Sequence, residues 1–153
     1  MKIFVFSDTH GRLSTAEKAL SLNEDANIIV FLGDGERDLE EMGYLLKGKN
    51  VIKVCGNCDR FSSLSDCCTF RAGNVKFYCT HGFNEKVKYG TSLLAVRARE
   101  AGCKVALYGH THQKSDSTVD GIRLINPGSA FNGDYAVITV EGDEILSVEQ
   151  EYV

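Results

Sequence analysis

The feature that most constrains the fold of this chain is a series of short apolar segments that each end in acidic, amide or histidine side chains. The first three span residues 2–6, 28–32 and 51–54, and they lead into Ser7-Asp8, Gly33-Asp34 and Cys55-Gly56-Asn57. A continuous apolar run of four or five residues, bounded by turn residues, is typical of a buried strand. The sequence therefore predicts strands that place polar side chains at their carboxyl ends.

Helical patterns separate these predicted strands. Ser14 and Glu17 form a predicted capping box, with an apolar stripe that runs to Leu22. Apolar side chains recur at helical spacing again over residues 39–46, before a turn at 47–50. The β-α-β-α-β order with continuous apolar strands favours parallel pairing covered by helices, and ligands of such sheets bind at the carboxyl ends of the strands.

The second half of the chain changes from this alternation to hairpins. Its predicted elements are a strand at 75–79, a helix at 92–101 closed by Gly102, a strand at 105–108, and antiparallel pairs near 115–126 and 134–152. With 153 residues the chain is too short for two ordinary domains. We expect one domain over residues 1–153 with a single core.

The charge balance excludes some classes of partner. The chain has 17 basic and 21 acidic residues, so broad electrostatic capture of nucleic acid or an anionic membrane is not expected. No stretch approaches the roughly 20 apolar residues of a membrane-spanning helix, and the early apolar run is too short for a signal peptide. We therefore expect a cytoplasmic protein whose six cysteines are reduced thiols. The sequence is compatible with a homo-oligomer.

All four histidines follow apolar runs, at the same strand-end position as two aspartates. The residues that share this position are Asp8, His10, Asp34, His81, His110 and His112. A histidine that only packs would fall anywhere in the pattern, so the coincidence favours one convergent site. For any single histidine, a hydrogen-bonded surface or core imidazole explains the sequence equally well.

Three of the strand-end segments have ligand chemistry of their own. Asp8 and His10 can turn toward one ion, although Asp8 could instead cap the following helix. Asp34 lies between two glycines, where a ligand can approach the backbone closely, or where a turn can form. The segment with His110 and His112 gives the strongest single indication of a metal site, because residues two apart on an extended segment point the same way.

Taken in order, these segments resemble the signature of the calcineurin-like metallophosphoesterase family, D-x-H, G-D, G-N-H-[DE], H-G and G-H-x-H. The resemblance covers residues 8 to 112. The short chain and its Gly-Asn-Cys-Asp block are similar to the small YfcE-type phosphodiesterase subgroup. The resemblance implies an α/β fold, a four-layer αββα sandwich of two mixed sheets flanked by helices, and metal-dependent hydrolysis of a small phosphodiester.

The resemblance also implies a ligand set for two divalent cations per chain. One would be held by Asp8, His10 and His112, the other by Asn57, His81 and His110, with Asp34 as the bridge. Mixed oxygen and nitrogen donors suit manganese, with nickel, iron and zinc as alternatives. With two carboxylates the site would carry a net charge near +2, which attracts anions, and a metal-bound hydroxide would attack phosphorus.

The catalytic candidates are Asp34, Asn57, Cys58 and Asp59. Cys58 stands where larger family members carry a histidine thought to protonate the leaving oxygen. The resemblance therefore leaves two candidates for the general acid, this thiol or another group. A cysteine with an ordinary pKa of about 8.5 could donate a proton, but we favour a small filler. Asp59 is predicted to orient a neighbouring imidazole, or else to lie in a surface turn.

Two other classes of protein compete with a hydrolase. The same fold serves as a scaffold in a retromer subunit that has lost some of the metal-binding histidines, whereas none is missing here. A redox or zinc protein could use Cys55-x-x-Cys58 with Cys67-Cys68. That interpretation is disfavoured, because a redox pair usually opens a helix and no helical pattern follows Cys58.

Overall fold

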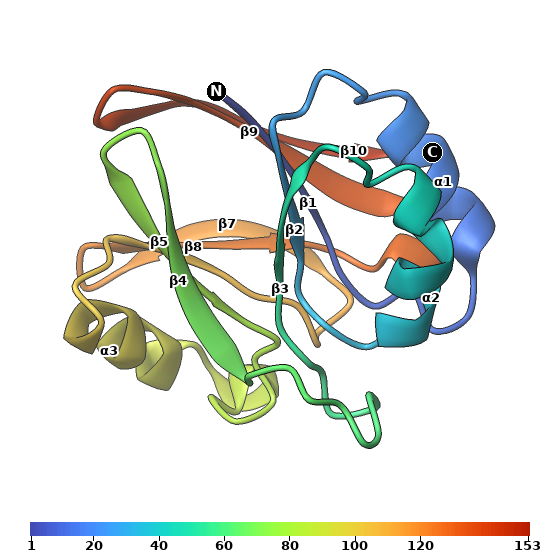
Figure 1. Ribbon diagram of the computed structural model, residues 1–153. Helices are drawn as coiled ribbons and strands as arrows, with labels where there is room; N and C mark the ends of the chain where they lie inside the picture. The colour runs from blue at the N-terminus through green and yellow to red at the C-terminus, as the bar shows by residue number, and fades with distance from the viewer.

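The computed structural model describes residues 1–153 and contains two five-stranded sheets with helices on their outer faces (Figure 1). The first sheet has the order β10 (Glu144–Tyr152), β9 (Asp134–Glu141), β1 (Lys2–Phe6), β2 (Ile28–Phe31) and β3 (Asn50–Lys53). The second has the order β4 (Cys67–Ala72), β5 (Val75–Thr80), β6 (Val105–Leu107), β8 (Ile122–Pro127) and β7 (Lys114–Val119).

Three α-helices and three short 3₁₀ segments complete the chain. They are α1 (Leu13–Ser21), α2 (Glu36–Glu41), η1 (Met42–Tyr44), η2 (Val87–Tyr89), α3 (Ser92–Glu100) and η3 (Ala130–Asn132). Both sheets are mixed: β1, β2 and β3 run parallel in one, and β5, β6 and β8 run parallel in the other. The predicted four-layer αββα sandwich is confirmed. No helix is both long and apolar enough to cross a bilayer.

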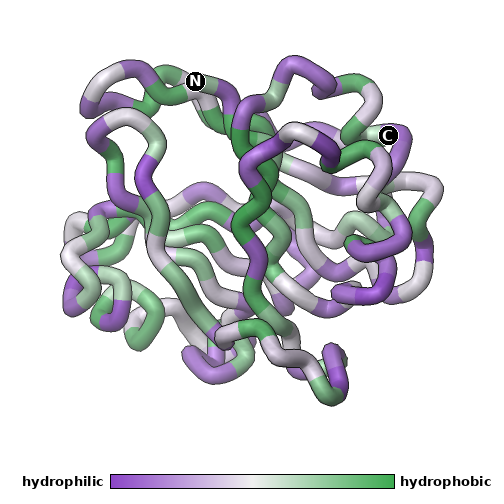
Figure 2. The backbone as a smooth tube through the Cα atoms, in the orientation of Figure 1, coloured by the Kyte–Doolittle hydropathy of each residue, from purple (hydrophilic) through white to green (hydrophobic).

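Three apolar layers replace the single core that the sequence led us to expect. Ile3 and Val5 belong to the largest cluster, between the two sheets, whereas Phe4 and Phe6 pack with α1 and α2 on the outer face. A third cluster lies between the second sheet and α3. Successive side chains of a strand point to opposite faces, so two packed sheets with outer helices create three apolar interfaces. Figure 2 shows hydrophobic residues along the central strands.

The sequence located most elements but not all of them. The two antiparallel hairpins and the helix before Gly102 are confirmed. The strand at 67–72 was missed, because this edge strand is buried on only some of its positions. The capping box is wrong: α1 begins at Leu13 with Arg12 at the cap and no side-chain cap bond. The helix expected at 39–46 begins earlier, at Glu36, and divides into α2 and η1.

The two sheets meet where the parallel strands end. Asp8, after β1, donates its N–H to the carbonyl of Gly33, after β2, at 2.9 Å. Gly109 follows β6 in the other sheet, and a β-carbon there would overlap the hydroxyl of Ser7. Only glycine lets the loops of the two sheets approach this closely. Side chains from five strand ends can therefore share one site.

Candidate metal centre

The structure brings Asp8, His10 and His112 together although His112 is more than a hundred residues away in the chain. Asp8 Oδ1 lies 3.2 Å from His112 Nε2 and 3.5 Å from His10 Nε2. The two Nε2 atoms are 3.3 Å apart. The Asp8 side chain is fully buried, and its Oδ1 has no hydrogen-bond partner, while its Oδ2 accepts from the N–H of His110. A buried carboxylate oxygen that faces two imidazole nitrogens fits a cation.

A second group of donors, from Asp34, His81 and His110, lies beside the first. His81 Nε2 is 3.3 Å from Asp34 Oδ2 and 3.2 Å from His110 Nδ1. The other nitrogen of His81 donates to the carbonyl of Leu32 at 2.7 Å, which leaves Nε2 free to bind a cation. Asp34 Oδ2 also lies 3.7 Å from His10 Nε2, so this carboxylate stands between the two groups.

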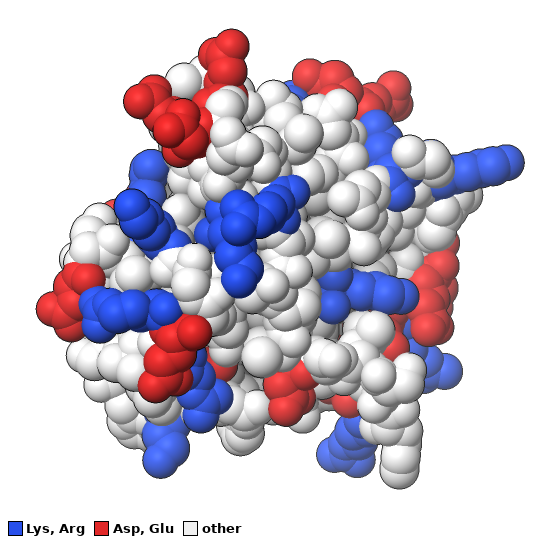
Figure 3. Space-filling model, turned by 60° about the vertical axis from the view of Figure 1, so that its left-hand side comes forward, with Lys and Arg blue, Asp and Glu red and all other residues white.

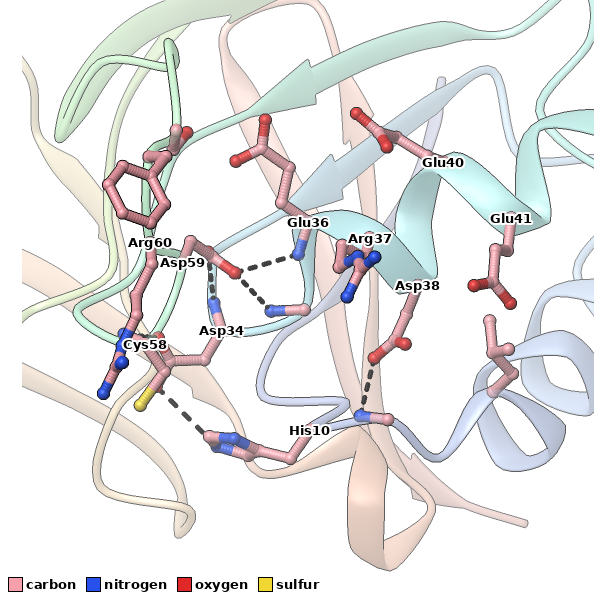
Figure 4. Close-up of a pocket in the computed structure, with 15 residues that line it drawn as sticks. His10, Asp34, Glu36, Arg37, Asp38, Glu40, Glu41, Cys58, Asp59 and Arg60 are labelled. Carbon is pink, nitrogen blue, oxygen red and sulfur yellow. Dashed lines mark hydrogen bonds and ion pairs between the residues drawn. The ribbon is translucent and has the colours of Figure 1, made fainter.

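Asp59 holds the Asp34 segment in place, and not an imidazole as predicted. Its carboxylate accepts four backbone N–H groups at 2.7–3.0 Å, from Gly56, Asp34, Gly35 and Glu36. Figure 4 shows it beside Asp34 at the start of α2. The sequence could not indicate this role, because it requires the loop after β3 to fold back onto the amino end of α2, where carboxylates cap free N–H groups.

The other residues of the Gly-Asn-Cys-Asp block lie at the rim of the site. A β-carbon on Gly56 would overlap the backbone nitrogen of Asp34, so the two loops pass in close contact. The N–H of Cys58 donates to Asp34 Oδ1 at 2.8 Å. Its thiol belongs to a group with His10 and Asp34 whose donor atoms lie within 4.8 Å of one another. The Asn57 amide is exposed and contacts the Cys58 sulfur at 3.6 Å.

Backbone strain is concentrated at this site. Eight non-glycine residues have positive φ, and five of them are Asp8, His10, Asp34, His110 and His112. The left-handed region is unfavourable for side chains with a β-carbon, and such residues persist where the surrounding structure holds them. The chain thus keeps its clustered donors in strained positions, as functional sites often do.

In the absence of metal, Asp34 and His81 shift each other's pKa. Burial raises the pKa of the Asp34 carboxyl, but the hydrogen bond and charge of His81 outweigh it and bring the pKa to about 2. Burial lowers the pKa of His81, yet Asp34 and Asp8 raise it overall. Burial and the charge of His81 lower the pKa of His110. A proton on His81 therefore takes the place where a cation would neutralise these carboxylates.

Residues that sequence reasoning missed support the ligand loops. Asp38 of α2 is buried and accepts from the Thr9 hydroxyl and from the N–H of Gly11, on either side of His10. Asn126, the second-last residue of β8, donates to the carbonyl of Gly109 at 3.0 Å. The sequence gives little indication of these roles, since single polar residues are common near the ends of helices and strands.

The environments of Cys55 and Cys58 argue against a redox site built on this pair. Burial and the neighbouring Asp66 carboxylate raise the pKa of Cys55 to about 11, and burial and Asp34 raise the pKa of Cys58. The Cys55 sulfur contacts the carbonyl of Leu64 and Asp66 Oδ1, both at 3.3 Å. Reactive or metal-binding cysteines have lowered pKa values, so neither thiol has the environment of a redox site.

A four-layer sandwich with carboxylates and imidazoles gathered at its strand ends defines a class, the metal-dependent phosphoesterases. The chain belongs to the calcineurin-like phosphoesterase superfamily, whose domain model matches residues 1–143. It is 30% identical over 149 residues to the probable metallophosphoesterase YsnB of Bacillus subtilis, covering 94% of this chain and 86% of the relative. It is 27% identical over 144 residues to the phosphodiesterase MJ0936 of Methanocaldococcus jannaschii, covering 84% and 83%.

Solved structures share this fold. Vps29 of Entamoeba histolytica, in complex with zinc, matches with a TM-score of 0.78 and 20% identity, covering all of this chain and 98% of that one. A protein of this fold can therefore bind a metal ion, and metal binding alone does not establish hydrolysis.

Proposed function

We propose that this protein hydrolyses phosphodiesters with two divalent cations held side by side at the strand ends. The single observation that carries the proposal is the pair of adjacent three-donor groups, with Asp34 of the second group also close to His10 of the first. Asp8, His10 and His112 would hold one cation, Asn57, His81 and His110 the other, and Asp34 would bind both. Cations held by these residues would supply Lewis acidity for phosphate ester hydrolysis.

Contacts within the chain orient two of these candidate ligands before a cation binds. The Leu32 carbonyl orients His81, and Asp59 and the N–H of Cys58 orient Asp34. A preformed donor set reduces the reorganisation that catalysis requires. Because Cys58 acts on Asp34 through its backbone, we favour its thiol as a small filler and not as the general acid.

The donor chemistry favours a transition metal. Imidazole nitrogens with carboxylate oxygens suit manganese, iron, nickel or zinc, and we propose manganese as the physiological ion. Asn57 would have to rotate from its contact with Cys58 to become a ligand, so we expect metal binding to move this side chain.

A diester is favoured over a monoester by the name of the relative MJ0936 and by the space on both sides of the site, described below. A long nucleic-acid strand is not favoured. Basic and acidic side chains are interspersed over the face in Figure 3, where basic groups gather near the middle and acidic groups above them. We therefore propose a small phosphodiester as substrate.

The proposal is tested with chelated protein that is reloaded with manganese, nickel, iron or zinc and assayed with bis(p-nitrophenyl) phosphate. We expect no turnover without metal and the highest turnover with manganese. The matched pair of variants is Asp8→Asn, which removes a ligand, and Asp143→Asn, which changes an exposed carboxylate in the turn between β9 and β10. A protein that binds metal normally yet hydrolyses no diester or monoester would be a scaffold.

A further inference from the structure

Two separate cavities open on the metal centre. The larger one, of about 850 Å³, is lined by His10, Asp34 and Cys58. The smaller one, of about 280 Å³, is lined by Asn57 and His81. Their linings have no residue in common, and they are separated by the loop after β3, which presents Asn57 to one and Cys58 to the other. A phosphate at the centre would therefore have space for a substituent on each side.

Phe61 in the larger cavity is unusual for an apolar residue. Its relative exposure is 104%, so its ring contacts almost nothing in the protein. Its φ of +60° makes it one of the three positive-φ non-glycine residues outside the five at the metal centre. Single exposed phenylalanines are common on protein surfaces. An exposed ring on strained backbone in a cavity that also contains Asp34 has both faces free for a ligand.

The smaller cavity also exposes an aromatic ring. Phe83 is 53% exposed and meets the His110 ring edge to face, with centroids 5.5 Å apart and an interplanar angle of 88°. One part of the ring thus positions His110, and the rest lines the cavity. A volume of about 280 Å³ is near the lower limit for small-molecule sites, so this side has room for a small group.

The charged side chains that line the larger cavity limit which substrate groups can bind in it. Helix α2 presents Glu36, Glu40 and Glu41 to it, and Arg37 and Arg60 are its two basic residues. Figure 4 shows Glu36 and Glu40 on the same side of the helix. A substituent with further phosphates would lie against these carboxylates, whereas an uncharged aromatic group would not be repelled.

We propose that the substrate is a phosphodiester with one alcohol group in each cavity, and that Phe61 binds an uncharged aromatic ring, an aryl group or a nucleobase, on the larger side. This inference rests on the proposed function. It makes Phe61 a specificity residue that contacts substrate without taking part in the chemistry.

The test compares Phe61→Ala with Tyr152→Ala, a matched control that removes another exposed ring outside both cavities. Aromatic contacts are worth about 0.5–1.5 kcal/mol, so Phe61→Ala should raise the KM for bis(p-nitrophenyl) phosphate roughly two- to tenfold with little change in kcat. Because the Phe61 side chain is fully exposed, its removal should leave the fold intact. The control should match the wild-type protein.

Binding gives a second measurement that does not depend on turnover. Calorimetry of the manganese-loaded protein should show diphenylphosphinate binding roughly two- to tenfold more weakly to Phe61→Ala, and dimethylphosphinate, which has no ring, binding equally to both. Unchanged affinity for diphenylphosphinate, or an equal loss for both phosphinates, would overturn the inference. If the wild-type protein hydrolyses no diester but binds diphenylphosphinate in a Phe61-dependent way, the proposed function fails and ring recognition stands.

Discussion

Asp8→Asn should have opposite effects on stability with and without metal. The Asp8 carboxylate is fully buried, and its Oδ1 has no hydrogen-bond partner. An asparagine could keep an oxygen for the N–H of His110 and place its amide N–H groups toward the nitrogen of His112, now 3.2 Å from Oδ1. In the metal-free protein the substitution therefore replaces a buried carboxylate oxygen that has no hydrogen-bond partner by an amide that has one.

The expected magnitude follows from that unsatisfied atom. A buried polar group without a partner costs about 1–3 kcal/mol, and more when it is charged. Metal-free Asp8→Asn should thus be about 1–3 kcal/mol more stable than wild type. At about 2–4 °C per kcal/mol for a chain of this size, its Tm should rise by at least 2 °C. With manganese at a thousand times its Kd, each bound ion stabilises wild type by about 4 kcal/mol, and the variant should lose most of the contribution of the ion that Asp8 would hold.

The assay is thermal and urea denaturation of wild type, Asp8→Asn and the control Asp143→Asn, each in chelator and in excess manganese. We expect the order of stability between wild type and Asp8→Asn to invert when metal is added, while Asp143→Asn follows wild type. If Asp8→Asn is the less stable protein in chelator, Asp8 is already satisfied by a protonated histidine and the unsatisfied-charge explanation is wrong.

Three further substitutions or conditions give separate tests. Asp34→Asn should weaken both metals and reduce kcat by at least about a hundredfold, measured by metal content and diester turnover; two tightly bound ions would contradict its bridging role. Cys58→Ser should change aryl diester turnover by less than about tenfold, below the contribution of a general acid, and a larger loss confined to poor leaving groups would make the thiol the acid. Because the pKa of His81 is raised despite its burial, protons compete with metal there, so affinity should fall on acidification and binding should release protons, as measured by calorimetry in two buffers.

The clustering of these candidate ligands was largely predictable because the residues obey a positional rule. Asp8, His10, Asp34 and the later histidines each follow a buried strand, and parallel strands bring their carboxyl ends to one edge of a sheet. The residues that support these ligands, by contrast, have no feature in the sequence that sets them apart from ordinary turn or helix residues. Asp59 was predicted to orient an imidazole, because its actual backbone partners lie in the loop after β3 and at the start of α2, whose contact is set by tertiary packing.

The same reasoning explains the other errors. The strand at 67–72 lies at a sheet edge, so its sequence carries only a partial apolar pattern. Phe61 lies in a loop where nothing in the sequence separates an exposed ring from a buried one. Its free ring, its strained backbone and its cavity appear only in the structure.

The number of manganese ions that restores activity tests the two-metal proposal most directly. Fully chelated protein is titrated with manganese while bis(p-nitrophenyl) phosphate turnover and bound metal are both recorded. We predict no turnover at zero metal and a plateau at two equivalents per chain, because Asp34 belongs to one donor group and also lies 3.7 Å from His10 of the other. Turnover in the metal-free protein, or a plateau at one equivalent with no second ion bound, would contradict this account.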